Sequence, residues 1–137
     1  MLAFVDLVMF LLVSSSTIEA SVVTSMGVRR DYIENYLTLD AGFVPFAEKY
    51  SGKYELVLLS NDVSQWSTYI TEYHQLNGYF KDKIVSADVS CRKPQKEIYE
   101  LALKRIGKRA EECCFIDNSV SNLNVAAELG IVPILFN

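Results

Sequence analysis

Short apolar segments alternate with amphipathic stretches along the C-terminal two-thirds of the chain. The apolar segments have the length of β-strands and cover residues 55–59, 84–87, 113–116 and 131–136. Between them lie residues 63–77, 95–106 and 118–129, whose apolar positions are spaced three and four apart, as in helices with one buried face. The pattern predicts an α/β fold of the Rossmann-like type, in which helices cover both faces of a mostly parallel central sheet in three layers. Residues 56–59 and 132–136 are apolar at successive positions, so we expect both strands to be buried on both faces.

Residues 1–14 form a further apolar run, and periodicity alone does not distinguish a strand from other apolar segments. A secretory signal has a Lys or Arg before its apolar core, whereas this run has none and contains Asp6. The run is also too short for a transmembrane helix. We therefore favour a buried β-strand over a signal peptide.

Residues 14–39 differ from the rest of the chain. They begin with a Ser/Thr-rich segment, and we expect one helix at residues 16–26, a break at Gly27 and a second helix at residues 30–36. The predicted organisation is a core domain of residues 1–13 and 40–137 with a short helical, cap-like insertion at residues 14–39. A further helix is expected at residues 44–50, with Pro45 in its first turn, where a missing N–H group is harmless.

Composition and charge narrow the classes of function. The chain has 17 acidic and 13 basic side chains, so no positive field would attract nucleic acid or an anionic membrane. We expect a cytoplasmic protein with a small-molecule partner, and the sequence does not indicate its oligomeric state. Cys113 and Cys114 are neighbours whose side chains would point to opposite faces of a strand, so a disulfide framework is not expected. His74 is the single histidine, which argues against zinc sites and histidine-dependent nucleophiles and leaves it as a polar helix residue.

Polar residues follow several of the predicted strands. In an open parallel sheet, ligands bind beyond the carboxyl ends of the strands, so these positions are the candidates for function. They are Asp6, Ser60-Asn61-Asp62, Arg92-Lys93-Pro94 and Asp117-Asn118-Ser119. Each segment alone is explained by helix capping or helix entry. Together, a hydroxyl, an ammonium and carboxylates at one edge would hold a dianion and a cation.

Three segments of the chain resemble motifs II, III and IV of the haloacid dehalogenase (HAD) superfamily, in that order. They begin at Leu58-Leu-Ser-Asn-Asp, Arg92-Lys-Pro-Gln-Lys and Phe115-Ile-Asp-Asn-Ser. The resemblance implies a HAD-like fold and a hydrolase that acts on a phosphate ester. It also implies that Ser60 and Asn61 hold the transferring phosphoryl group, and that Lys93 bridges the nucleophile and the phosphate.

The same resemblance is incomplete at motifs I and IV. The family has a strand ending in Asp-x-Asp-Gly, where the first aspartate attacks phosphorus and the second acts as general acid and base. The nearest match puts Asp6 at the nucleophile, with Val8 and Met9 at the positions of the second aspartate and the glycine. Motif IV has Asp117-Asn118 in place of two adjacent acids. The resemblance implies a Mg²⁺ ion held by Asp6, Asp117 and Asn118, in a site that the neutral amide weakens.

Three functions follow from these observations. The first is a Mg²⁺-dependent phosphatase that forms an aspartyl-phosphate on Asp6 and acts on a small phosphorylated metabolite. Val8 and Asn118 also suit a second function, that of a HAD-fold module that binds a ligand without turnover. A metal-independent haloacid dehalogenase is the third, because such enzymes use the same nucleophile and lack the second aspartate. The motif IV segment is closer to the phosphatase form than to the dehalogenase form.

Overall fold

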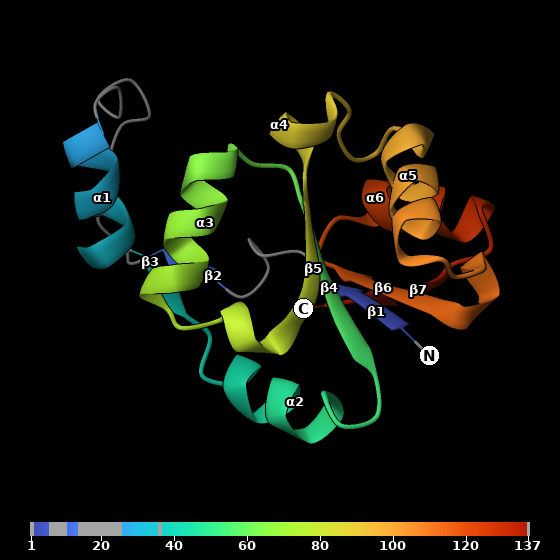
Figure 1. Ribbon diagram of the computed structural model, residues 1–137, viewed down its shortest axis with the longest axis horizontal. Coiled ribbons are helices and arrows are strands. Elements are labelled where there is room, and N and C mark those ends of the chain that lie inside the picture. The colour runs from blue at the N-terminus through green and yellow to red at the C-terminus, as the bar shows by residue number, and fades with distance from the viewer. Residues whose placement is uncertain (1, 6–10, 14–25, 36, 137) are drawn as a thin grey trace.

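A five-stranded sheet forms the centre of the protein (Figure 1). The computed structural model describes residues 2–5, 11–13, 26–35 and 37–136. The strands of the sheet, in the order β5-β4-β1-β6-β7, are Phe80–Val85, Glu55–Ser60, Leu2–Val5, Cys113–Asp117 and Val132–Leu135. Every neighbouring pair is parallel. All five carboxyl ends therefore meet at one edge, and we call the part formed by the ends of β4, β1 and β6 the carboxyl edge.

Helices cover the sheet in two layers. One face carries α2 (Phe43–Tyr50) and α3 (Ser64–Tyr73), and the other carries α5 (Lys96–Ile106) and α6 (Val120–Glu128) (Figure 1). A short helix, α4 (Ser86–Val89), follows β5, and 3₁₀ turns precede β5 and β6. The arrangement confirms the predicted three-layer α/β fold with a parallel central sheet.

Strand β4 shows how the two layers are built. Leu56 and Leu58 belong to the hydrophobic cluster beneath α2 and α3, whereas Val57 and Leu59 belong to the cluster beneath α5 and α6. Successive side chains of a strand point to opposite faces, so an unbroken apolar run suits a strand that is covered on both sides. The prediction that this strand is buried on both faces is confirmed.

Strand β5 differs from its prediction. It covers Phe80–Val85 instead of residues 84–87, and Ser86 and Ala87 belong to α4. The strand lies at the edge of the sheet and pairs only with β4 among the described strands, so part of its surface faces solvent. Polar residues such as Lys81 and Asp82 are therefore tolerated in it, and the apolar pattern indicated only its last two residues.

The predicted burial of the last strand is wrong. In β7, the side chains of Val132, Ile134 and Leu135 are 45%, 42% and 48% exposed. Its apolar sequence predicted a strand covered on both faces, but β7 is the other edge of the sheet and pairs only with β6 among the described strands. Sequence alone did not show that this strand would have one neighbour rather than two.

The N-terminal apolar run forms two strands instead of one. Leu2–Val5 is β1, the central strand of the main sheet, and Leu11–Val13 is β2. Strand β2 pairs antiparallel with β3 (Leu37–Leu39) in a separate two-stranded sheet. Residues 6–10 between the two strands lie outside the described residues.

The predicted insertion is described in part. Helix α1 (Met26–Asn35) begins before the expected second helix and includes Gly27, so the predicted break at Gly27 is wrong. A single glycine inside a helix costs only about 1 kcal/mol, and Ile33 of this helix is buried in the cluster with α2 and α3. Nearly all of the helix expected at residues 16–26 lies outside the described residues. The assignment of residues 14–39 as a cap stays a prediction.

Contacts between aromatic and charged side chains join α1 to α3. The guanidinium of Arg30 lies 5.2 Å from the ring centroid of Tyr69, and the Tyr69 hydroxyl donates a hydrogen bond to the Glu34 carboxylate. That hydrogen bond raises the pKa of Tyr69.

No helix among the described residues is long and apolar enough to cross a membrane.

His74 caps the C-terminal end of α3 and is partly buried. Its Nε2 atom is buried and has no hydrogen-bond partner among the described residues. Burial lowers the pKa of His74 from its ordinary value of 6.5, because desolvation disfavours the charged imidazolium. The folded protein therefore prefers the neutral side chain.

We expect His74 to make the protein sensitive to mild acid. Its folded pKa lies below its unfolded pKa, so its contribution is complete above about pH 6.5 and is lost as the pH falls from there through the lower folded pKa. His74→Gln should flatten the change in the free energy of unfolding between about pH 7 and pH 5, where most carboxylates stay ionised. Urea denaturation followed by the fluorescence of Trp66 measures this change. Equal slopes in the two proteins would contradict the assignment.

Candidate functional site at the carboxyl edge of the sheet

Ser60 and Asp117 lie at the ends of the two strands that flank β1. Ser60 is the last residue of β4 and Asp117 the last of β6, and both are fully buried. Val5, the last residue of β1, pairs with Leu58 on one side and Ile116 on the other. The two polar side chains therefore flank the carboxyl end of the central strand. Asp6 follows Val5 in the sequence but lies outside the described residues, so its predicted role stays a prediction.

A buried ion pair joins Lys93 to Asp117. The Lys93 Nζ atom lies 3.0 Å from Asp117 Oδ2, and the two side chains are 1% and 0% exposed. Removing charges from water costs several kcal/mol per ion, so such a pair persists only when good geometry and further hydrogen bonds compensate. Lys93 comes from the segment before α5 and Asp117 from β6. The ion pair thus brings together two parts of the site that are distant in the sequence.

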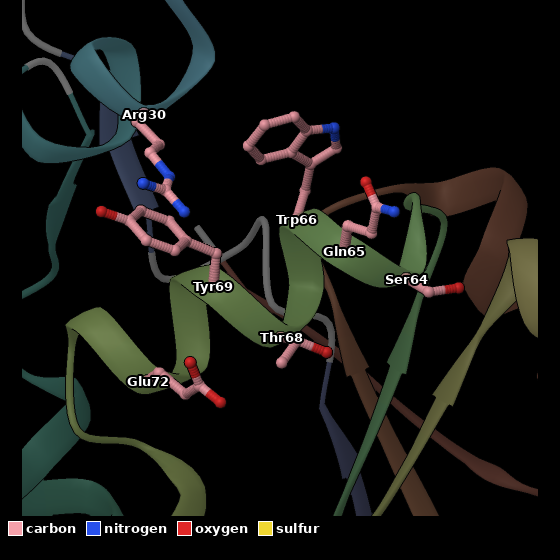
Figure 2. A pocket seen from close by; sticks show the side chains of 7 residues that line it. All are labelled: Arg30, Ser64, Gln65, Trp66, Thr68, Tyr69 and Glu72. Atoms are coloured by element: carbon pink, nitrogen blue, oxygen red, sulfur yellow. The ribbon is translucent and has the colours of Figure 1, made fainter. Parts of the chain in front are cut away.

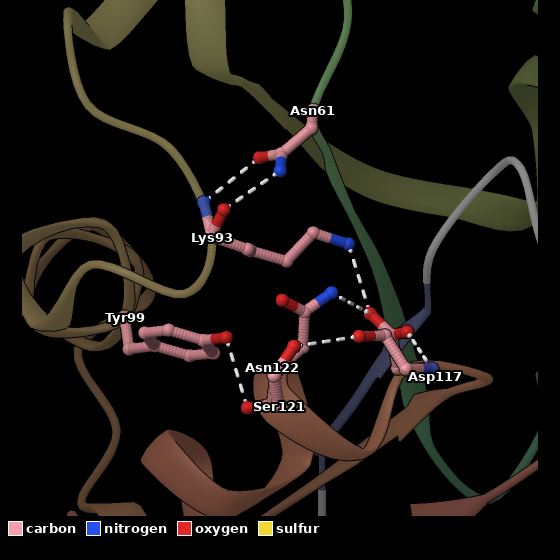
Figure 3. Close-up of polar contacts among 7 residues, drawn as sticks. Asn61, Lys93, Tyr99, Asp117, Ser121 and Asn122 are labelled. Carbon is pink, nitrogen blue, oxygen red and sulfur yellow. Dashed lines mark hydrogen bonds and ion pairs between the residues drawn. The ribbon is translucent and has the colours of Figure 1, made fainter.

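Two further donors satisfy the Asp117 carboxylate (Figure 3). The Asn122 side chain donates from Nδ2 to Oδ2 at 3.0 Å, and the Ser119 backbone N–H donates to Oδ1 at 2.7 Å. Both donors lie at the start of α6 (Val120–Glu128): Ser119 is its N-cap, and Asn122 is in its first turn. Together these contacts fix the orientation of the carboxylate.

Tyr99 supports this cluster from α5, and the sequence analysis missed it. Its hydroxyl donates to the backbone carbonyl of Asn122 at 3.0 Å, and its ring meets that of Phe115 edge to face. The Phe115 ring in turn lies 5.3 Å from Lys93 Nζ, a favourable position for a cation. Tyr99 occupies the buried face of a predicted helix, where an apolar role was the simplest explanation. A tyrosine hydroxyl on a buried face was the available signal, since it needs a partner.

Asn61 binds the backbone of Lys93 with both ends of its side chain. The Lys93 N–H donates to Asn61 Oδ1 at 2.8 Å, and Asn61 Nδ2 donates to the Lys93 carbonyl at 2.9 Å. These contacts connect the loop after β4 to the segment before α5 (Figure 3). The predicted part of Asn61 in phosphoryl binding stays a prediction, and the described contacts of its side chain are with the protein.

The Ser60 hydroxyl is buried and has no hydrogen-bond partner among the described residues. Ser67 Oγ and His74 Nε2 share this property, but Ser60 is the one at the end of a strand of the carboxyl edge. A buried hydroxyl without a partner is unfavourable by about 1–3 kcal/mol. The carboxyl edge therefore offers a hydrogen-bonding group whose need a ligand would satisfy.

The described residues do not form a magnesium site on their own. No group of three or more His, Cys, Asp or Glu side chains in the described part of the chain is arranged to hold a metal. Asp117 is bound by an ammonium and two N–H donors, and Asn118 is exposed. Mg²⁺ in proteins is bound through one or two carboxylates together with waters and substrate phosphates, so Asp117 would need ligands besides its own oxygens. Asp6, the further carboxylate that the resemblance implies, lies outside the described residues.

Cys91 lies two residues before Lys93 and is not activated as a nucleophile. Burial and the charge of Glu97 both raise the pKa of its thiol. A reactive cysteine needs a lowered pKa, because the thiolate is the attacking species. The arrangement therefore favours oxygen nucleophiles over sulfur.

Two cavities among the described residues lie away from the Lys93–Asp117 ion pair. One cavity of about 330 Å³ lies along α3 beside α1, where Arg30 reaches over the ring of Tyr69 (Figure 2). Another of about 330 Å³ is apolar and lies between α2 and the strands β6 and β7. Neither cavity is lined by Ser60, Lys93 or Asp117. The polar cluster, not the size of a cavity, identifies the carboxyl edge as the candidate site.

Comparison with solved structures gives several relatives in fold. The HAD family enzyme bt-2542 from Bacteroides thetaiotaomicron, in a magnesium complex, is 19% identical over 98% of this chain and 91% of that one, with a TM-score of 0.77. The wild-type bt-2542 protein in complex with magnesium and inorganic phosphate is 19% identical over 97% and 92% of the two chains, with a TM-score of 0.76. The HAD-hydrolase YfnB from Bacillus subtilis, bound to magnesium, is 25% identical over 80% of this chain and 48% of that one, with a TM-score of 0.71. At such identities the similarity concerns the fold.

Comparison with protein families gives a match over most of the chain. Residues 15–130 match the haloacid dehalogenase-like hydrolases, so the matched region contains Ser60, Lys93 and Asp117 and begins after Asp6. No curated protein matches the sequence significantly. The fold, the order of the motifs and this match lead to one conclusion: the chain belongs to the haloacid dehalogenase-like hydrolase family.

Proposed function

We propose that the protein is a phosphoric monoester hydrolase that acts on a small phosphorylated metabolite through an aspartyl-phosphate. The observation that carries this proposal is the buried Ser60 hydroxyl, which lacks a partner among the described residues at the edge where Lys93 and Asp117 form their ion pair. A phosphoryl oxygen is an acceptor that would satisfy this hydroxyl. A nearby ammonium group would offset part of the dianion's charge.

Each residue then has a distinct role. The Asp6 carboxylate attacks phosphorus, the bond to the leaving oxygen breaks, and water later hydrolyses the aspartyl-phosphate to regenerate the carboxylate. Ser60 donates to a phosphoryl oxygen, and Lys93 reduces the repulsion between the two anions. Asp117 holds the Lys93 ammonium in place, as their contact of 3.0 Å supports.

The proposal includes a weak dependence on Mg²⁺. Asp6, Asp117 and Asn118 would hold the ion, and the ion would supply positive charge that stabilises the phosphoryl group during transfer. Asn118 brings a neutral amide, and Asp117 already shares its charge with Lys93. We therefore expect the protein to bind Mg²⁺ less tightly than a site with two free carboxylates would.

Asp6→Asn should abolish hydrolysis of p-nitrophenyl phosphate in the presence of Mg²⁺. Replacing a nucleophile leaves only binding and electrostatic effects, so we expect kcat to fall by about a thousandfold or more. The release of p-nitrophenol measures the rate. Glu100→Gln is a matched control, since it removes one exposed acidic charge on α5 and should leave the rate unchanged. Undiminished activity of Asp6→Asn would show that Asp6 is not the nucleophile.

The proposed enzyme should also depend strongly on the leaving group. Val8 stands where the resemblance places the general acid, so little help is available to protonate the leaving oxygen. A general acid contributes about 10²–10⁴-fold, so phenyl phosphate should exceed glycerol phosphate in kcat/KM by at least about a hundredfold. Val8→Asp should narrow that ratio. Equal kcat/KM values for the two substrates in the unmodified protein would contradict this prediction.

A module that binds a phosphorylated ligand without turnover is the second candidate function. The exposed position of Asn118 and the full engagement of Asp117 with donors favour it, because both reduce the ability to bind a metal. The buried Ser60 hydroxyl and the Lys93 ammonium would still recognise phosphate in such a module.

Calorimetric titration with inorganic phosphate distinguishes the two candidates. If the protein is a hydrolase, Mg²⁺ should strengthen phosphate binding, because a divalent cation offsets the repulsion between the dianion and the carboxylates. EDTA should reverse that gain and remove turnover. Phosphate binding that is independent of Mg²⁺, together with no release of p-nitrophenol, would instead support the binding module.

A further inference from the structure

The loop after β4 contains a side chain that supports the position of Lys93. Asn61 directly follows Ser60, and its carboxamide accepts from the Lys93 N–H and donates to the Lys93 carbonyl. Two hydrogen bonds to the same residue fix both the position and the orientation of its backbone. Ser60 is therefore joined to Asn61 by a peptide bond, and Asn61 is joined to Lys93 by this pair of hydrogen bonds.

Helix capping does not explain this arrangement. The N-cap of α3 is Val63, which makes no side-chain cap hydrogen bond, and the Val63 N–H donates to Asp62 Oδ1. Asn61 takes part in neither contact. The described contacts of its side chain reach 32 residues along the chain to Lys93, which indicates a role in the site and not in local structure.

Lys93 needs such support because its side chain is long. A lysine has four rotatable side-chain bonds, and holding its ammonium at one point costs up to about 2 kcal/mol of conformational entropy. Asp117 fixes the ammonium end at 3.0 Å, and Asn61 fixes the backbone end. With both ends held, the ammonium has a defined position relative to Ser60 before any ligand binds.

We propose that Asn61 is a positioning residue, which holds Lys93 so that one phosphate dianion meets both the Lys93 ammonium and the Ser60 hydroxyl. The part of this inference that concerns phosphate binding holds for a hydrolase and for a binding module alike. Its effect on turnover rests on the proposed function. Asn61 acts through Lys93, so its loss should weaken phosphate binding and lower kcat without a change of nucleophile.

A neighbouring pair of contacts provides a matched control. The Ser86 hydroxyl accepts from the Asp62 N–H at 3.0 Å and donates to the Asp62 carbonyl at 3.1 Å. It therefore binds the same loop in the same manner, but connects it to the start of α4 and not to Lys93. Ser86→Ala removes a comparable connection from the loop and leaves the Asn61 side chain on Lys93.

The test compares Asn61→Ala, Asn61→Asp and Ser86→Ala with the unmodified protein. Hydrogen exchange of the Lys93 amide reports the contact itself, and calorimetry with inorganic phosphate reports its effect on the site. For Asn61→Ala we expect exchange at Lys93 to accelerate and phosphate affinity to fall, each by about tenfold or more, since the variant removes both hydrogen bonds to Lys93. Asn61→Asp keeps the acceptor for the Lys93 N–H and should give an intermediate rate of exchange, while its added negative charge lowers phosphate affinity by repulsion. Ser86→Ala should leave both quantities unchanged, even if it lowers the melting temperature.

The results separate this inference from the proposed function. Unchanged phosphate affinity in Asn61→Ala, or an equal loss in Ser86→Ala, would overturn the positioning role even if the protein hydrolyses phosphate esters. Phosphate binding that depends on Asn61 without any turnover would instead refute the hydrolase and leave the positioning role standing. Failure of the unmodified protein to bind phosphate would overturn both.

Discussion

The buried ion pair between Lys93 and Asp117 is the constraint on which the site depends. Two charges with almost no exposure to water are stable together only because each is compensated within the protein. Removing one partner of such a pair costs about 3–5 kcal/mol, since the other charge stays buried. The contacts of Asn122, the Ser119 N–H and the Phe115 ring all serve this compensation. The start of α6 and the segment before α5 are thereby held against the end of β6.

The parallel sheet explains why these groups meet at all. Because all neighbouring strands are parallel, each ends at the same edge, and the residues that follow come from distant parts of the sequence. Ser60 and Asp117 are the last residues of β4 and β6, which lie on either side of the central strand. Lys93 lies in a loop. Its position therefore depends more on side-chain contacts than the positions of strand residues do. Asn61 is one of these contacts.

Sequence periodicity predicted the parts of the fold in which a segment has uniform surroundings. The buried strand β4 and the amphipathic helix α5 were identified for this reason, as was the alternation of strands and helices from β4 to β7. Periodicity failed at the edges of the sheet, where β5 contains polar residues and the apolar β7 is exposed. The number of neighbours of a strand follows from the whole topology, and no local pattern of residues encodes it.

The candidate site was predictable in its residue types but not in its contacts. Ser60, Lys93 and Asp117 stood out because polar groups follow strands and because three segments resemble family motifs. Tyr99 and Asn61 act over separations of 23 and 32 residues, through a hydroxyl and a carboxamide whose partners are backbone atoms. Any sequence offers the same backbone atoms, so only the folded structure selects which of them a side chain meets.

The charges of the site indicate how a phosphate dianion would be accommodated. With Val8 and Asn118 at the positions of two acids, the proposed site has fewer carboxylates than the family pattern, while Lys93 is kept. Repulsion of a dianion therefore falls along with the affinity for a divalent cation, since both depend on the same carboxylates. A site of this kind relies less on a metal to admit phosphate and relies more on a well-placed ammonium. Under the proposed function, binding of the anion would then depend on the placement of Lys93 by Asp117 at one end and by Asn61 at the other.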